Sequence, residues 1–531
     1  MRFTNDCTLP RRNLLPKALC LALGLMLVAI AGASASNIGS SMLLGLISTK
    51  TEEVYPLEPV ERDLTSLYDL VYEGLFTIND DYRPEGKLVE SWVAPTGNGK
   101  TWTFRLKSGI MFSDGTPLTA GDVVATTQYI LDRARDESAS YKGYYGNLRY
   151  FIESVRAEDD LTVVMKASRS YYGLLYALTY PILPADRVDQ PNPPGTGPYV
   201  MNFIPREHAA LTVNSKWWHQ PPKVKEILAV FHVNNRDIID SYEYARVDTV
   251  FTRSISAAQY KSGMTSLRLD YRSRQLETLL MNNSRLEFQD VRVRQAIRYA
   301  INIDQIAASV YMNMVLRTDT PLPAGNWLYA DNVSAYANDL EKAKALLEEA
   351  GWRDPDGDGM RNMVVDGKPR NLNVQLYVYE DSENSVRVET ANMIKDMLAK
   401  VGIRVNINIE TFADVANRLP NGSYDMALAS YQMDLVPDPG FLLMSGNVSA
   451  GNYSRYRDEE MDRLFKELRT KVDPAAFSQT LNAIQQKFTQ DVPFICLFYR
   501  SGAVLTRKMY TTARDVRELE LLRGIENFAG N

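Results

Sequence analysis

The residues best suited to binding a small ligand lie in one short stretch of the chain. Residues Ser423–Leu428 predict a strand, and Tyr431–Pro439 follow as a turn that carries Asp434, Asp438 and two prolines. Aspartate and proline are ordinary turn residues, so the turn itself needs no functional explanation. However, the aromatic Tyr431 stands three residues before Asp434. A carboxylate held in a cleft beside a flat apolar wall suits a cationic group on a small ligand.

The elements that position this turn belong to a large chain of ordinary composition. The chain has 531 residues, of which 45% are hydrophobic and 23% charged. This length exceeds what one core accommodates, so two or three domains are expected. The net charge is −6, with both signs mixed along the chain. The basic stripe of a nucleic-acid-binding protein is missing, which excludes that class.

Residues 1–35 have the features of a secretory signal peptide. Basic residues precede the apolar run Ala18–Gly32, and Ala33–Ala35 form a small-residue cleavage site. As a helix the run covers about 22 Å, which is short of a roughly 30 Å hydrocarbon core. We therefore expect secretion across the cytoplasmic membrane, to a periplasm or the exterior of the cell envelope. Cleavage would leave Cys496 as the remaining cysteine, in an apolar run typical of a buried thiol.

The middle of the chain predicts an α/β unit. Apolar and polar residues alternate over Leu372–Val378 and again over Ile403–Ile409, which indicates two half-buried strands. Between them, Glu383–Val401 has helical spacing, and Gly402 supplies a C-terminal cap. A strand, helix and strand of these lengths imply parallel pairing of the two strands.

Other segments support the same class of fold. The helix that begins after Thr119 has Asp122 three residues on, a variant of the capping box. The remaining patterns predict strands at Met42–Ile47 and Trp102–Leu106, and helices at Leu64–Phe76, Asp290–Ile301 and Asp339–Ala350.

Motifs for catalysis or metal binding are weak. Gly97–Thr101 resembles part of a phosphate loop but is followed by a strand pattern, which favours a hairpin turn. Asp354–Gly359 begins like a calcium loop but lacks the glutamate at position twelve, which favours a solvated turn. The histidines His208, His219 and His232 have no zinc-site spacing. We expect no catalytic residues, no metal and no cofactor.

Five segments together resemble one family. They are the Asp434 turn and four further motifs, Leu70–Leu75 (LVYEGL), Trp102–Val123, Gly195–Tyr199 (GTGPY) and Asp290–Ile297 (DVRVRQAI). The family is that of the extracytoplasmic oligopeptide- and dipeptide-binding proteins of bacterial peptide- and nickel-type ABC importers. The likeness runs in order from about Leu44 to Tyr499.

The resemblance implies a two-lobed periplasmic-binding-protein fold. Each lobe is a cluster of mixed sheets with helices, and an extra subdomain is inserted in the first lobe. Turn-rich stretches of the sequence then divide the chain into a signal peptide (1–35), a first lobe (36–68, 195–280 and 490–531), the inserted subdomain (69–194) and a second lobe (281–489).

The resemblance also implies a function. In the family a short peptide binds extended between lobes that close on it by hinge motion, and an ABC importer permease receives it. The position of Asp434 pairs with the peptide's α-ammonium, beside an aromatic wall three residues earlier. Tyr431 replaces the usual tryptophan of that wall. The stretch Asp434–Pro439 is one residue longer than usual, so Asp438 is the alternative acceptor.

Other functions remain open at the level of sequence. Relatives on this fold carry nickel chelates, haem or sugars, and a sensory protein of the same fold would look alike. A secreted hydrolase that uses a carboxylate pair is a further alternative. We expect a non-enzymatic, monomeric receptor that binds no nucleic acid.

Overall fold

The computed structural model describes most of the chain after residue 40. Residues 1–40, 60, 98, 137–142, 264–265, 334–335, 381–384, 508–509, 512–515, 526–528 and 531 are not described. The expected signal peptide therefore lies outside the described residues. In the part of the chain that is described, no helix is both long and apolar enough to cross a membrane.

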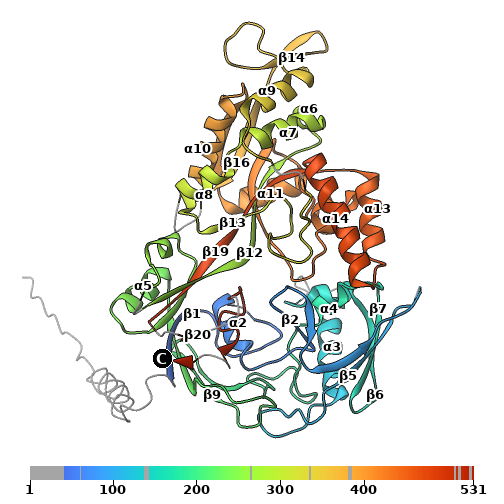
Figure 1. The fold of residues 1–531 in the computed structure, drawn as a ribbon, viewed down its shortest axis with the longest axis vertical. Coiled ribbons are helices and arrows are strands. Elements are labelled where there is room, and N and C mark those ends of the chain that lie inside the picture. Colours follow the sequence, from blue (N-terminus) through green and yellow to red (C-terminus); the bar gives the residue numbers. More distant parts are fainter. Residues whose placement is uncertain are drawn as a thin grey trace, which may run out of the picture.

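One large mixed sheet extends through the whole molecule (Figure 1). Eleven strands form it, and β13 (Val315–Arg317) pairs only with β19. The other ten lie in the order β17 (Arg404–Glu410), β16 (Asn373–Tyr379), β18 (Met426–Gln432), β12 (Leu267–Met281), β19 (Phe494–Thr506), β11 (Thr249–Thr252), β1 (Ser41–Ile47), β10 (Glu226–His232), β9 (His208–Val213) and β8 (Tyr199–Ile204).

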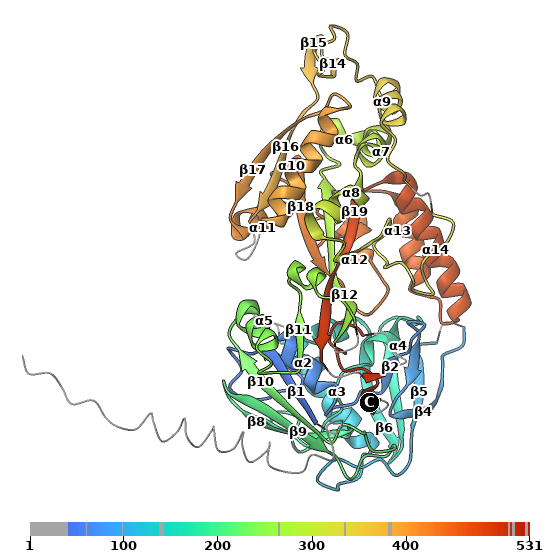
Figure 2. The same cartoon turned by 60° about the vertical axis from the view of Figure 1, so that its left-hand side comes forward.

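The strands β12 and β19 join the two ends of this sheet. The first half of β12, from Leu267 to Arg272, pairs antiparallel with the second half of β19, and Leu276–Leu280 pair with the first half. The register shifts between Arg272 and Leu276, so the regular pairing is interrupted there. Figures 1 and 2 show both strands running from an upper part, built from α6–α14 and β13–β18, into a lower part, built from β1–β11 and α2–α5.

The upper part contains the predicted α/β unit. β16 and β17 pair in parallel, as expected, and α10 (Val386–Ala399) connects them. Gly402 follows the helix with φ of +84°, which confirms the predicted cap. The other helices there are α6 (Leu286–Gln289), α7 (Val291–Ala300), α8 (Ile303–Tyr311), α9 (Leu340–Glu349), α11 (Phe412–Asn421), α12 (Gly440–Leu443), α13 (Glu459–Leu468) and α14 (Pro474–Asp491), and β14 (Asn362–Val365) and β15 (Lys368–Asn371) form a hairpin.

The lower part adds a small antiparallel sheet to the large one. Its order is β4 (Val89–Val93), β5 (Thr101–Leu106), β7 (Thr162–Ala167) and β6 (Ile152–Asp159). β4 and β5 pair antiparallel, which confirms the predicted hairpin in place of a phosphate loop. The helix α3 (Ala120–Arg135) opens with both capping-box bonds between Thr119 and Asp122, as predicted. Shorter elements are α2 (Arg62–Tyr68), β2 (Phe76–Ile78), β3 (Pro84–Gly86), α4 (Leu174–Ala177) and α5 (Asn235–Glu243).

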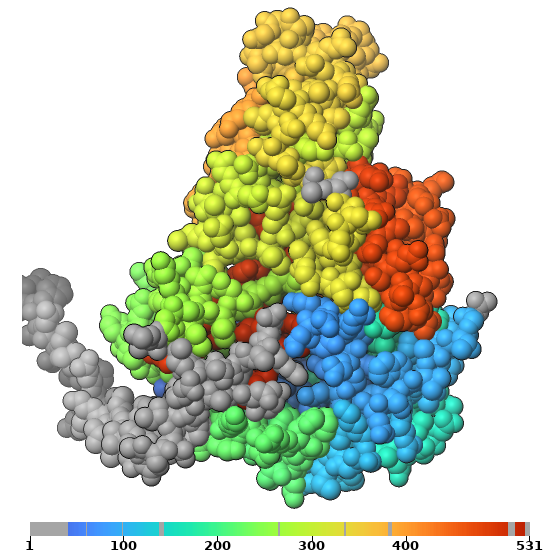
Figure 3. All heavy atoms as spheres, viewed as in Figure 1, coloured from blue at the N-terminus to red at the C-terminus, as the bar shows by residue number. Residues whose placement is uncertain are grey.

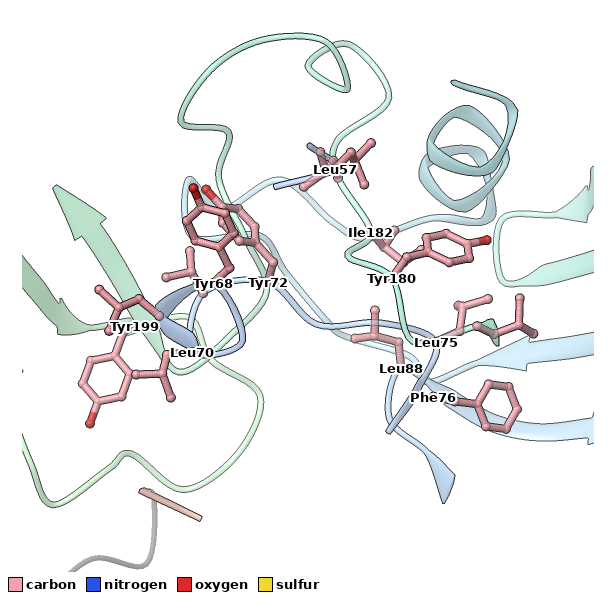
Figure 4. Packing of buried hydrophobic residues seen from close by; sticks show 14 of the residues in the cluster. Leu57, Tyr68, Leu70, Tyr72, Leu75, Phe76, Leu88, Tyr180, Ile182 and Tyr199 are labelled. Atoms are coloured by element: carbon pink, nitrogen blue, oxygen red, sulfur yellow. The ribbon is translucent and has the colours of Figure 1, made fainter. Parts of the chain in front are cut away.

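The predicted helix Leu64–Phe76 is wrong after residue 68, where α2 ends. The backbone carbonyls of Leu70 and Val71 instead accept hydrogen bonds from Tyr199 and Gly197, at 3.0 and 2.9 Å. These partners belong to the GTGPY turn, so a contact distant in sequence overrides the local helical pattern. Figure 4 shows the result, a core in which Leu70 lies near Tyr199 while Leu75 packs on the side of Tyr180.

The predicted domain limits stay predictions. The sheet is continuous through β12 and β19, so both parts share its central strands.

Candidate functional site

A cavity of about 1030 Å³ lies where the upper and lower parts meet. Its walls come from segments far apart in the sequence: 56–87, 144–181, the 432–450 turn region, and the C-terminal stretch 519–525. On the face drawn in Figure 3, red C-terminal residues are visible in a hollow between the green and yellow segments above and the segments below. A volume of this size suits a ligand larger than a single amino acid.

The strand β18 delivers Asp434 to this cavity. β18 ends at Gln432, and the turn that follows lines the cavity with Met433, Asp434, Leu435 and Val436. The side chain of Asp434 is exposed to the cavity, and its Oδ1 accepts a hydrogen bond from the N–H of Leu435 at 2.7 Å. No cation lies within ion-pair distance of this carboxylate among the described residues. Asp434 therefore keeps acceptor capacity for a ligand.

Asp438 lines the same cavity but is already paired. Its carboxylate accepts Arg469 Nε at 2.7 Å and Nη2 at 3.1 Å, and it accepts the N–H of Gly440 at 3.0 Å. Burial alone would lower the pKa of Arg469, but the charge of Asp438 outweighs it and raises that pKa. This pair fixes the end of the turn at the start of α12.

Tyr431 lies beside the turn rather than on the cavity wall. Its side chain is buried, its hydroxyl donates to the carbonyl of Gly451 at 3.0 Å, and its ring lies parallel to Tyr453 at 6.1 Å between centroids. Burial raises the pKa of its hydroxyl far above the ordinary value. The residue is not among those that line the cavity. The structure gives Tyr431 a packing role, and a ligand contact stays a prediction, as it does for Asp434 and Asp438.

A group of tyrosines that lines the cavity was not predicted from the sequence. Eight of the thirty tyrosines lie within residues 141–180, and this local excess was the available signal. The cavity is lined from that region by Tyr144, Tyr145, Tyr150, Tyr171, Tyr176 and Tyr180. Tyr171, Tyr176 and Tyr180 are almost fully buried, whereas Tyr144 and Tyr150 expose aromatic surface.

The cavity also contains an acidic residue that no motif indicated. Asp69 lies just after α2 and is exposed to the cavity, yet the surrounding protein limits its hydration and raises its pKa to about 7, with a further contribution from Glu520. Glu73, which lines the same cavity, has partners within the protein. It accepts the indole N–H of Trp218 at 2.8 Å and lies 3.3 Å from Lys87.

The other candidate motifs lie outside the cavity. His232 bonds Ser241 at 2.7 Å and the carbonyl of Val230, and Cys496 is buried, as predicted, with its thiol pKa raised by burial. The oxygens of Asp354, Asp356 and Asp358 come within 4.8 Å of one another, but all three residues are exposed, and Asp354 accepts N–H groups of its own turn.

The fold is a mixed α/β architecture with a cavity where its upper and lower parts meet. The chain belongs to family 5 of the bacterial extracellular solute-binding proteins, whose defining pattern matches residues 83–453. The family consists of transport-associated binding proteins and not of enzymes, which confirms the prediction of a non-enzymatic protein. The chain is thus a solute-binding protein of the ABC importer type.

Individual relatives are distant but nearly full length. Oligopeptide-binding protein AppA of Bacillus subtilis (strain 168) is 23% identical over 94% of this chain and 96% of its own. Heme-binding protein A of Haemophilus influenzae is 25% identical over 72% of this chain and 73% of its own. The crystal structure of NikZ from Campylobacter jejuni in complex with Ni(L-His) matches with a TM-score of 0.69 at 19% identity, covering 92% and 99% of the two chains. These likenesses confirm the fold and leave the ligand open.

Proposed function

We propose that this protein captures short peptides between its two lobes outside the cytoplasm and delivers them to an ABC importer permease. In this proposal Asp434 receives the peptide's α-ammonium group. The observation that carries it is the contrast inside one turn: the carboxylate of Asp438 is held by Arg469, whereas that of Asp434 faces the cavity with no cation of the described residues within 4.0 Å.

The lining of the cavity supports the same proposal. The exposed tyrosines Tyr144 and Tyr150 line the same cavity as the Asp434 turn and offer aromatic surface to a ligand. The likeness to an oligopeptide-binding protein over nearly the whole chain agrees with a peptide ligand. Haem and nickel chelates are the other solutes that the names of relatives suggest.

The first test is mass spectrometry of small molecules released from the natively purified protein. A mixture of short peptides is the expected result. A single haem or metal chelate in place of peptides would overturn the peptide assignment while keeping the family. Binding without uptake, in cells supplied with peptides as sole nitrogen source, would favour a sensory role.

The role of Asp434 can be tested with Asp434→Asn. Removing the charge that faces a bound ammonium should weaken peptide binding by about 2–5 kcal/mol in isothermal calorimetry. The apo protein should unfold at nearly the same temperature, because Asp434 is exposed to the cavity.

Asp396→Asn provides the matched control, since Asp396 is an exposed residue of α10 outside the cavity. Its affinity should equal that of the wild type. If Asp434→Asn binds the same peptides within twofold, Asp434 is not the ammonium acceptor.

A further inference from the structure

Residues close to the C-terminus form part of the cavity wall. The strand β20 (Tyr510–Thr511), labelled near the C-terminus in Figure 1, pairs antiparallel with β21 (Ala529–Gly530) and brings the two ends of the intervening chain together. Between these strands residues 516–525 are described, and we call them the C-terminal loop. Residues 519, 520 and 522–525 of this loop line the cavity. The loop lies outside residues 83–453, so the family pattern does not include it.

Polar and apolar contacts hold the C-terminal loop to the lower part. Arg517 donates to the backbone carbonyls of Ile78 and Asn79, at 3.1 and 2.5 Å. The carboxylate of Glu518 lies 2.8 Å from the Nε of Arg62. Four apolar side chains of the loop join a buried hydrophobic cluster: Val516, Leu521, Leu522 and Ile525. The loop is therefore a packed part of the wall with a defined position.

The same contacts place the loop beside the turn that carries Asp434. The carboxylate of Glu518 accepts the N–H of Arg274, and the carbonyl of Arg274 accepts the N–H of Met433 at 2.8 Å. One residue of β12 thus connects Glu518 to the start of the turn. Leu519 follows Glu518 in the chain and lines the same cavity as Asp434.

Leu519 has a backbone conformation that is unfavourable for a leucine. Its φ is +70°, which lies in the left-handed region. In that region the β-carbon of an L-residue crowds the backbone, and glycine is favoured. Such residues persist where the surrounding structure fixes them, and they gather at ligand sites. A leucine at this position therefore calls for a role of its side chain.

Packing in the core does not account for this leucine. Leu519 is half-buried, and among the described residues it belongs to none of the hydrophobic clusters, one of which Leu521 and Leu522 join. It lines the cavity instead. An apolar side chain at a ligand site contributes free energy when a ligand removes it from water.

We propose that the C-terminal loop is a specificity element of the ligand site, in which the side chain of Leu519 limits the size of the apolar ligand side chain that binds against it. This inference rests on the proposed function, because it takes the ligand to be a peptide. An apolar wall discriminates between ligand side chains by volume, and each methylene changes the affinity by roughly tenfold or more.

The test uses an equimolar pool of synthetic peptides of two to six residues. Each peptide is polyalanine except at one position, which carries Gly, Leu, Phe or Trp. The purified protein, freed of bound molecules, is incubated with the pool and desalted, and the retained peptides are identified and counted by tandem mass spectrometry. The variants are Leu519→Ala, Leu519→Gly, Leu519→Phe and, as matched control, Leu286→Ala. Leu286 of α6 is half-buried like Leu519 but lies outside the cavity lining.

The size preference should move in opposite directions in two of the variants. At one ligand position, Leu519→Ala should raise the retention of Phe and Trp relative to Leu by about fivefold or more, and Leu519→Phe should favour Gly and Ala. A merely structural role would not give this result, because a folding defect lowers the retention of all peptides alike. Leu286→Ala should keep the wild-type profile.

Thermal unfolding separates the backbone of residue 519 from its side chain. Leu519→Gly should show the same size preference as Leu519→Ala but unfold at a higher temperature, because glycine adopts a φ of +70° more readily. A lower unfolding temperature for Leu519→Gly would count against the proposal, since the leucine would then not be retained against a backbone cost.

Unchanged size profiles in Leu519→Ala and Leu519→Phe would overturn the role of Leu519 and leave peptide binding standing. A wild type that retains no peptide would refute the proposed function itself. If Leu519→Phe does not fold, the profile of Leu519→Ala decides.

Discussion

At the scale of single residues, the environment gives identical side chains different tasks. Asp434 and Asp438 lie four positions apart in one turn, yet one faces the cavity and the other holds Arg469. Asp438 could accept a ligand's ammonium only by giving up part of this pairing, which is buried and costly to break. Asp434 carries no such cost, so it is the better acceptor.

Asp69 predicts a pH dependence of stability. Its pKa is about 7 in the folded protein, mainly through burial and then through Glu520, against 3.8 as its ordinary value. Between these values the folded state keeps a proton that the unfolded state has released. The stability that Asp69 contributes is therefore complete below about pH 3.8 and is lost as pH rises through about 7. Asp69→Asn should remove this loss, as measured by urea unfolding from pH 4 to 8.

The comparison with the wild type isolates this one group. Asp63 also has a raised pKa, of about 6, but it is present in both proteins and cancels in the difference. A difference curve that is flat over this range would show that Asp69 ionises normally in the folded state.

At the scale of elements, β12 is held to its neighbours by a buried cluster of charges. Glu277 on β12 lies 3.1 Å from Arg387 of α10 and 2.7 Å from Arg500 of β19. Burial alone would raise the pKa of Glu277, but the two arginines together lower it. The cluster thus ties a helix and two strands together close to the register shift in β12.

Glu277→Gln should destabilise the protein by about 3–5 kcal/mol at neutral pH, because it removes a buried carboxylate charge that lies within 3.1 Å of two confined guanidinium groups. The stability that Glu277 contributes is present above its ordinary pKa of 4.5 and is lost as pH falls through the lowered value. The mutant and the wild type should therefore converge in acid, as urea unfolding at pH 7 and pH 3 would show.

Glu389→Gln serves as the control on the same helix. Glu389 is exposed and, among the described residues, bonds Ser385 one turn away, so its loss should change the free energy of unfolding by less than about 0.5 kcal/mol. Equal effects of the two substitutions would contradict a structural role for the Glu277 cluster.

The elements also show how far sequence reasoning reaches. The β16–α10–β17 unit and the capping box at Thr119 were predictable, because periodicity and cap residues are local signals. The position of Asp434 at the cavity followed from the resemblance and the turn. Arg274, which also lines the cavity, could not be found in this way, because the pairing of β12 with β18 brings it beside Met433 from more than 150 positions away. The same holds for residues 69–76, whose backbone conformation depends on hydrogen bonds from the distant GTGPY turn.

At the scale of the whole molecule, the two parts touch outside the shared strands as well. Trp327 of the upper part donates its indole N–H to the carbonyl of Tyr82 at 3.2 Å and to the hydroxyl of Tyr176 at 3.0 Å. The guanidinium of Arg83 lies 3.8 Å from the centre of the same ring. All three partners belong to the lower part, so this contact favours the arrangement in which the parts are close together.

Trp327→Ala should shift the protein toward a more open arrangement. Small-angle scattering of the apo protein should then give a larger radius of gyration, and peptide affinity should fall by roughly tenfold because less of the protein is competent to bind. Trp327 does not line the cavity, so a change in affinity would not reflect a lost ligand contact. Tyr244→Ala, at a residue that is 72% exposed, should change neither quantity. An unchanged radius and affinity in Trp327→Ala would exclude this contact as a determinant of closure.

The place of β19 in the sheet has a consequence for biosynthesis. Residues 494–506 lie between β12 and β11, so they join strands made hundreds of residues earlier. Until this late segment has been translated, the sheet is divided into two incomplete pieces with open edges. Pairings so distant in sequence form slowly and only after the chain is nearly complete. Completion of the large sheet therefore waits for residues 494–506, whereas the small sheet β4–β5–β7–β6 consists of segments made much earlier.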